Sequence, residues 1–138
     1  MKLINVEVIT PSKSAYSAGV VSVTVPGTKG NFQVLYNHAP ILSSLEIGKI
    51  KIVEQDETEK IFATGGGMIE VLDNHVLILV ESFESADEID VERAEKALER
   101  AKERLAHRND PNIDVARAEA ALKRAINRLK IAGRVPVH

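Results

Sequence analysis

The sequence predicts a segregated α+β fold, in which an N-terminal antiparallel β-sandwich (residues 1–86) is followed by a C-terminal antiparallel two-helix hairpin (residues 87–138). Three observations support this prediction. The first part carries short β-branched stretches separated by turn residues, as sandwiches do. The second part contains one helical unit twice. The third observation is that the two parts carry opposite net charge. Residues 1–89 hold six basic and twelve acidic residues, whereas residues 90–138 hold twelve basic and eight acidic residues.

Strand-like segments fill the first part of the chain at close spacing. Alternation of apolar and polar residues, or a β-branched run, marks each of them. The expected strands are residues 3–9, 19–25, 31–35, 49–53, 61–64, 68–72 and 75–80. Asp73-Asn74 predicts a tight turn between the last two strands. Short strands joined by such turns favour a sandwich or a barrel.

The glycine cluster Gly65-Gly66-Gly67 has two interpretations. Glycine-rich loops can hold a phosphate group, but a P-loop continues into a helix and a Lys-Ser/Thr pair. A strand-like segment follows here, so we favour a β-bulge or a close approach between strands.

The hairpin prediction depends on an internal repeat. Residues 89–105 and 113–129 are identical at twelve positions when one copy is shifted by 24 residues. Apolar residues recur in each copy at spacings of three and four, which is typical of a helix with one buried face. Pro111, within the intervening residues 106–112, cannot continue a helix. The two helices therefore fold back on each other along an alanine-rich seam.

Both helices begin with the same signals. Asp90 and Asp114 stand at the N-cap position, where a carboxylate oxygen can accept a hydrogen bond from a free backbone N–H. Ile89 and Ile113 precede them and can pack back on the first turn as a hydrophobic staple.

Each copy carries a stripe of arginines. At about 100° per residue, the second and third arginines of each copy fall within about 20° of the first. The stripes are Arg93, Arg100 and Arg104 in the first copy and Arg117, Arg124 and Arg128 in the second. One interpretation is structural: Asp90 pairs with Arg93, and the arginine stems cover the seam. The other is an anion site, in which the guanidinium groups and a helix N-terminus receive a phosphate chain. The residues alone leave both open.

Composition narrows the function classes. The chain has 138 residues and a net charge of −2. It has no cysteine, and its four histidines lack metal-ligand spacing, so we expect no metal site and no thiol nucleophile. No set of residues typical of an active site is evident. We also expect no nucleic-acid binding, no signal peptide and a soluble cytoplasmic protein. The tail, residues 133–138, carries no motif and is expected to fray.

Several motifs together resemble the epsilon subunit of the bacterial F-type ATP synthase. They are His38-Ala39-Pro40-Ile41-Leu42-x-x-Leu45-x-x-Gly48, Gly66-Gly67-Met68-Ile69-Glu70-Val71, and Ile89-Asp90-x-x-Arg93-Ala94 opening the hairpin. The resemblance covers residues 1–132. It implies a non-catalytic central-stalk subunit on the cytoplasmic face of the plasma membrane, reaching the membrane only through the complex. The implied partners are the gamma subunit, the c-ring and the catalytic alpha/beta hexamer.

The resemblance also implies a regulatory mechanism. In this family the hairpin permits ATP hydrolysis when it is folded on the sandwich and blocks hydrolysis when it extends along gamma. Some members bind ATP in the folded hairpin, as a regulatory ligand and not as a required cofactor. By position, the implied ATP-binding residues are Glu84, Ile89, Asp90, Arg93, Ala94, Arg100, Arg124 and Arg128. The dependence on Mg²⁺ stays open. His38 is either a structural residue or a partner contact.

Two other functions remain compatible with the sequence. The chain could be a stand-alone nucleotide sensor whose sandwich binds another protein. It could also be a structural adaptor without a ligand, with the arginines as a solvated rim.

Overall fold

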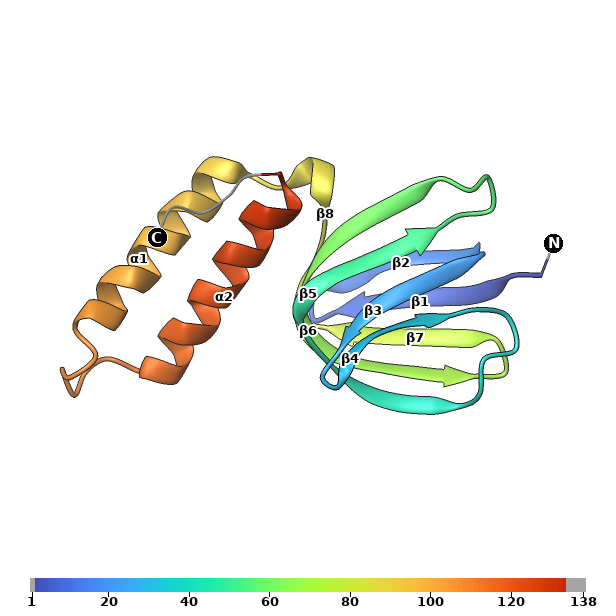
Figure 1. Cartoon of the computed structure of the whole chain (residues 1–138), viewed down its shortest axis with the longest axis horizontal. Helices are drawn as coiled ribbons and strands as arrows, with labels where there is room; N and C mark the ends of the chain where they lie inside the picture. The colour runs from blue at the N-terminus through green and yellow to red at the C-terminus, as the bar shows by residue number, and fades with distance from the viewer. Residues whose placement is uncertain (1, 134–138) are drawn as a thin grey trace. The chain divides into compact units, whose positions relative to one another are not determined.

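The computed structural model describes residues 2–133, and the chain forms two compact units, Met1–Ser85 and Ala86–His138. The first unit is built of strands and the second of helices (Figure 1). Apart from Gly133, the tail predicted to fray lies outside the described residues.

The first unit contains eight strands in one hydrogen-bonded sheet, with the order β2-β1-β7-β6-β5-β3-β4 and β8 paired with β6. Two of them are long enough to take part in both layers of a sandwich, namely β5 and β6. The strands are β1 (Ile4–Thr10), β2 (Lys13–Val20), β3 (Ser22–Gly27), β4 (Gly30–Val34), β5 (Ile41–Val53), β6 (Glu59–Leu72), β7 (His75–Val80) and β8 (Phe83–Ser85).

The sheet folds over on itself along β5 and β6. In one layer, the first half of β5 pairs with the second half of β6, which pairs in turn with β7, and β1 and β2 follow. In the other layer, the second half of β5 pairs with β3 and the first half of β6 pairs with β8. One cluster of buried apolar residues from both layers forms the core, and Ile50, Ile69 and Ile78 are among its fully buried members. The β-sandwich prediction is confirmed.

The glycine cluster lies inside β6, where the strand bends between the two layers. Gly66 and Gly67 adopt φ of 91° and 157°, which disfavours residues with a side chain. A Cβ atom on Gly67 would lie 1.9 Å from the carbonyl oxygen of Leu79 on β7. The close approach between strands is thus confirmed, and both strand-like segments around the glycines belong to one strand.

Three features of the sheet differ from the prediction. β1 and β7 pair in parallel, from Asn5↔His75 to Ile9↔Leu79, so the sheet is not wholly antiparallel. The segment 19–25 is two strands, because Val20 pairs with Ile4 on β1 and Ser22 pairs with Val53 on β5. The short strand β8 was not predicted. Its Phe83 ring stacks on Phe62 of β6 with the ring centroids 4.1 Å apart.

A partly buried hydrogen bond connects β2 to the β5–β6 hairpin. The Tyr16 hydroxyl donates to Glu54 at 2.7 Å, and Glu54 also forms an ion pair with Lys60 at 3.2 Å. Burial, together with the hydrogen bond to Glu54 and its negative charge, raises the pKa of Tyr16 well above its usual range. The folded protein therefore keeps this proton at a pH where an unfolded tyrosine loses it.

Substituting Tyr16→Phe should lower the free energy of unfolding at neutral pH by about 1 kcal/mol, the net value of one such hydrogen bond. Above about pH 10 the wild-type protein should lose stability steadily, because unfolded Tyr16 ionises and folded Tyr16 does not. The difference between wild type and variant should shrink over that range. Urea unfolding at a series of pH values measures it; a constant difference up to high pH would contradict the assignment.

The second unit is a helical hairpin preceded by a 3-10 turn (Ala86–Glu88). Its helices are α1 (Val91–Ala106) and α2 (Val115–Ile131). They lie side by side and antiparallel (Figure 1), which confirms the hairpin prediction. Its core is small and rich in alanine. The buried cluster is Ala94, Leu98, Ala125 and Leu129, Val91, Ala97, Leu122 and Ile126 pack against it, and Ala101 and Ala118 are buried as well.

Candidate functional site

The N-termini of the two helices are built alike, as the repeat predicts. Oδ1 of Asp90 accepts a hydrogen bond from the backbone N–H of Arg93 at 3.0 Å, and Asp114 does the same for Arg117 at 3.0 Å. The two N-cap predictions are confirmed. Because Oδ1 of Asp90 accepts from the backbone N–H of Arg93, the first role of this carboxylate is to cap the N-terminus of α1.

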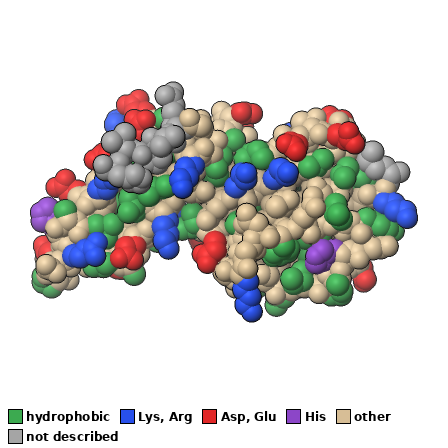
Figure 2. Space-filling view, viewed as in Figure 1, with side chains coloured by type: hydrophobic (Ala, Val, Ile, Leu, Met, Phe, Trp, Pro, Cys, Tyr) green, Lys and Arg blue, Asp and Glu red, His purple; other side chains and the backbone are tan. Residues whose placement is uncertain are grey.

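The two arginine stripes lie on the same face of the hairpin. In each helix the stripe is offset from the buried seam by roughly 100° in the same rotational sense. Two antiparallel helices that pack through equivalent seams are related by a two-fold axis perpendicular to the hairpin, and this axis keeps equivalent residues on one face. Basic and acidic side chains surround the apolar line between the helices in Figure 2.

Most of these arginines have no acidic partner. Within the described part of the chain, Arg93, Arg100, Arg104, Arg117 and Arg124 are exposed and make no side-chain ion pair. Lysines are the cations in two ion pairs of the hairpin, Lys96–Glu92 at 3.2 Å and Lys102–Glu99 at 3.9 Å. The hairpin thus presents guanidinium groups that are free to bind an anion.

The residues implied as ATP-binding occupy different environments. Glu84 lies on β8 of the first unit, where it pairs with Ala63, and the other seven belong to the second unit. Ala94 is fully buried in the hairpin core, and its N–H donates to the carbonyl of Asp90 at 3.0 Å. Ile89 is buried as well. The exposed residues of this set are Asp90, Arg93, Arg100 and Arg124.

His38 lies in the loop between β4 and β5, at the end of the sandwich that carries the β6–β7 turn. Its Nδ1 lies 2.6 Å from the carbonyl oxygen of Ala39, and its ring is half-buried near Phe32. The backbone N–H of Asn37 donates to Oδ1 of Asn74 at 2.6 Å, which fastens this loop to the turn. The His38 side chain thus contacts the backbone of its own loop and stays partly exposed to solvent.

The outer face of one sandwich layer exposes apolar side chains that sequence reasoning did not single out. Leu42 on β5, Met68 and Leu72 on β6, and Leu79 on β7 are between 39% and 65% exposed. Their positions opposite the buried residues of the same strands follow from the strand period of two. We call these four residues the outer apolar face.

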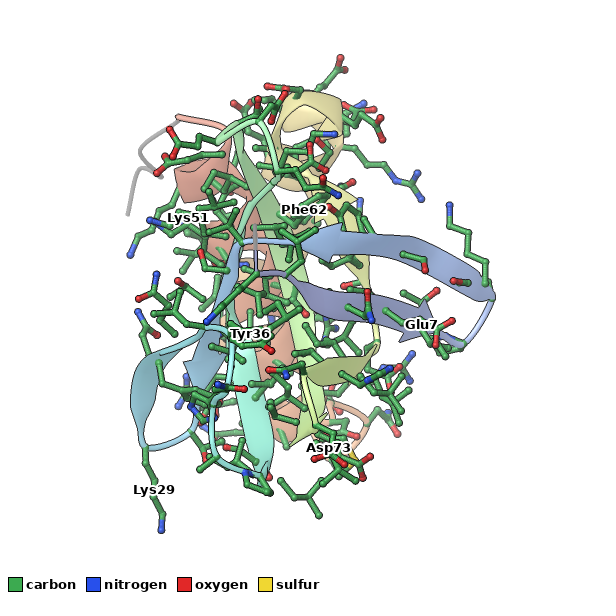
Figure 3. The ribbon with its side chains drawn as sticks, turned by 90° about the vertical axis from the view of Figure 1, so that its right-hand side faces the viewer. Glu7, Lys29, Tyr36, Lys51, Phe62 and Asp73 are labelled. Carbon is green, nitrogen blue, oxygen red and sulfur yellow. The ribbon has the colours of Figure 1, made fainter. Side chains whose placement is uncertain are left out.

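A groove of about 710 Å³ adjoins the outer apolar face. Its lining combines apolar side chains, including Leu72 and Leu77, with three carboxylates from β1, β6 and the β6–β7 turn, Glu7, Glu70 and Asp73. Figure 3 labels Glu7 and Asp73. The signal that could have found this surface is the row of apolar residues at outward positions of β6 and β7, Met68, Leu72 and Leu79.

Within residues 2–133, no cluster of three or more His, Cys, Asp or Glu side chains could hold a metal ion. No helix in that range is long and apolar enough to cross a membrane.

A β-sandwich followed by a hairpin of long helices defines a class of ATP synthase subunits, the delta/epsilon chains. The description "ATP synthase, Delta/Epsilon chain, beta-sandwich domain" matches residues 3–86, and "ATP synthase, Delta/Epsilon chain, long alpha-helix domain" matches residues 87–133. The chain belongs to the ATP synthase epsilon family, whose members are subunits of the synthase and not enzymes by themselves.

Individual relatives agree with this assignment. The ATP synthase epsilon chain of Anaeromyxobacter sp. (strain K) is 39% identical over 131 residues, which cover 95% of this chain and 98% of that relative. The epsilon chain of Pelotomaculum thermopropionicum is 50% identical over 100 residues, 72% of this chain and 74% of the relative. The resemblance inferred from the motifs is confirmed.

The fold also recurs in a solved structure. A chain in the cryo-EM structure of the Euglena gracilis mitochondrial ATP synthase, in its OSCP/F1/c-ring assembly, is similar with a TM-score of 0.76. The identity is 22%, and the match covers 89% of this chain and 77% of that chain. At this identity the likeness concerns the fold.

Proposed function

We propose that the chain is a regulatory central-stalk subunit whose hairpin binds ATP through its arginine face. Its partners would be the gamma subunit, the c-ring and the catalytic alpha/beta hexamer of the synthase. The single observation that carries the ATP proposal is that Arg93, Arg100 and Arg124 share one face of the hairpin and make no ion pair with residues 2–133. A structural rim would pair some of them with the carboxylates of the same helices.

The ATP site would be formed by both helices. In the antiparallel hairpin Ala94 and Leu98 pack with Leu129 and Ala125, so the start of α1 lies beside the end of α2. Because the stripes share a face, this arrangement brings the arginines of the two helices toward one phosphate chain. The phosphate ligands would be Arg93, Arg100, Arg124 and Arg128, with Ile89, Asp90 and Ala94 on the adenine side.

Ala94 and Asp90 would contribute mainly through the shape of the site. Ala94 fills the seam, and its small side chain lets the backbone of α2 approach. Asp90 holds the first turn of α1, and with it the backbone that positions Arg93. Their substitution would weaken binding by disturbing the helix start.

ATP would regulate by selecting the folded hairpin. The buried cluster of the hairpin contains two leucines and two alanines, and the further buried residues Ala101 and Ala118 are also small, so the free energy that holds it together is small. A ligand that binds only the folded hairpin stabilises it by about 2.7 kcal/mol when its concentration is 100 times its dissociation constant. That is enough to change which of two states is populated, folded on the sandwich or extended along gamma.

The outer apolar face would be the contact of the sandwich with gamma. Four exposed apolar side chains beside an acidic groove suit a partner surface that is apolar and carries basic residues. His38, in the loop at one end of the sandwich, would be the contact with the c-ring. Through these partners the subunit would be peripheral, on the cytoplasmic face of the membrane.

Isothermal titration of ATP into the full chain tests the nucleotide site. Wild type should release or absorb heat with a saturable isotherm. The double substitution Arg93→Gln/Arg124→Gln removes two charge-assisted contacts, each contributing about 1.5–3 kcal/mol, and should weaken binding roughly 100-fold or more. Arg108→Gln, in the turn between the helices, is the matched control and should bind like wild type. No heat from wild type with or without Mg²⁺ would end the proposal.

The same titration, with one purification, separates the alternatives. A ligand-free adaptor predicts no ATP binding by wild type. A stand-alone sensor predicts ATP binding but no stable complex with gamma when the two chains are expressed together. Substituting Met68→Glu on the outer apolar face should abolish co-purification with gamma and leave ATP binding unchanged.

A further inference from the structure

The hairpin has a basic pocket next to the turn that joins the helices, at the end away from the start of α1. This pocket measures about 260 Å³. It is lined by residues from the end of α1, the turn and the start of α2, namely Arg104, Asn112, Ile113, Asp114, Arg117 and Ala118. None of the arginines implied as ATP ligands belongs to it.

The internal repeat relates this pocket to the proposed nucleotide site. Shifted by 24 residues, Ile89, Asp90, Arg93 and Ala94 become Ile113, Asp114, Arg117 and Ala118. The shift also relates Arg104 to Arg128. The two-fold relation of the antiparallel helices therefore places an equivalent set of side chains at each end of the hairpin.

We propose that this pocket, here called the turn pocket, is a second anion site that binds a phosphate or diphosphate group between Arg104 and Arg117. The proposal goes beyond the nucleotide site above and does not depend on it. It rests on two guanidinium groups, one from each helix, that line one concave pocket and have no acidic partner within residues 2–133.

Charge and size decide which ligand fits. Two arginines against one carboxylate, Asp114, leave a net positive pocket, and Oδ1 of Asp114 already accepts from the backbone N–H of Arg117. Pockets for whole drug-sized molecules measure about 300–1,000 Å³, so a pocket of about 260 Å³ suits one or two phosphate groups better than a complete nucleotide. Arginine pairs match phosphate oxygens through parallel hydrogen bonds.

Nuclear magnetic resonance of the isotope-labelled full chain tests the turn pocket. The probes are inorganic phosphate, pyrophosphate and ATP, each compared with sodium chloride at equal ionic strength. Pyrophosphate should shift the backbone amides of residues 113–118 and the side-chain Nε signals of Arg104 and Arg117, with saturation. Arg104→Gln/Arg117→Gln should weaken this binding at least roughly tenfold, and Arg108→Gln should leave it unchanged.

Each outcome is decisive. If pyrophosphate saturates the site but ATP does not reach it, the ligand is a free phosphate or diphosphate; if ATP competes there, its phosphate chain is the source. Shifts that match those of sodium chloride, or that persist in the double variant, would overturn the inference. Signals of residues 89–94 report the nucleotide site separately, so either site can fail alone. Arg104→Lys/Arg117→Lys keeps the charge and should bind with intermediate strength, which excludes misfolding as the cause of a loss.

Discussion

Gly67→Ala should lower the free energy of unfolding of the sandwich by about 4 kcal/mol or more, or prevent folding altogether. Gly67 lies where β6 passes closest to β7, and an added methyl group would lie 1.9 Å from the carbonyl oxygen of Leu79. The obstacle is backbone, and backbone of a central strand cannot move aside without breaking the β6–β7 ladder. The φ of 157° adds strain for a residue with a Cβ atom.

Gly19→Ala on β2 is the matched control. A Cβ atom there meets the Leu3 side chain at 3.4 Å, which is ordinary van der Waals contact. The change in unfolding free energy should stay within about 0.5 kcal/mol. Urea unfolding followed by circular dichroism measures both variants. A Gly67→Ala protein as stable as Gly19→Ala would mean that the bend of β6 is not as close as described.

Leu129→Ala should unfold the hairpin while the sandwich stays folded. Leu129 is one of two leucines in the small hairpin core and is only 1% exposed. Removing a buried leucine side chain costs about 2–5 kcal/mol, and a core of this size has little stability in excess of that. Helical circular dichroism at ambient temperature should fall to the level of a chain without α1 and α2, with the strand signal retained.

The repeat supplies the control for this substitution. Leu105 is the equivalent of Leu129 in the first copy, but it is only half-buried near the turn. Leu105→Ala should therefore cost less and keep most of the helical signal. Equal losses of helical signal in the two variants would contradict the placement of the hairpin core between the start of α1 and the end of α2.

The hairpin was readily predicted from the sequence because its signals are local. Asp90 and Asp114 fix the helix starts, Pro111 lies in the turn, and the repeat sets the seam. All of these act within a few residues of one another. The observed helices begin at Val91 and Val115, directly after the predicted caps.

The parts of the sandwich that were missed depend on contacts between distant residues. The parallel pairing of β1 with β7 joins residues about half the chain apart, and no local pattern reports its direction. The chain crosses between the layers at Val21, within the strand-like run 19–25. No turn residue marks this crossing, so the run was predicted as one strand. β8 is too short to show the alternation of apolar and polar residues that predicts a strand. The stacking of Phe83 on Phe62 holds it against β6.

Among the features of the candidate sites, too, those with a periodic pattern were predicted from the sequence and others were not. The arginine stripes are periodic, so the sequence predicted them, and the structure adds that Arg93, Arg100, Arg104, Arg117 and Arg124 make no ion pair with residues 2–133. The burial of Ala94 could be predicted from the seam. The outer apolar face was missed although outward positions of β6 and β7 carry a signal for it, because inward positions of the same strands are apolar too.

Hydrogen exchange of the full chain with and without ATP tests the central claim most directly, namely that the hairpin is marginally stable and is stabilised by a polyphosphate on its arginine face. Without ATP, amides of residues 94–106 and 118–131 should exchange much faster than those of the sandwich core. Saturating ATP should slow them and leave the sandwich amides unchanged. Hairpin amides that are as protected as the sandwich core without ATP, or that ATP does not affect, would contradict the claim.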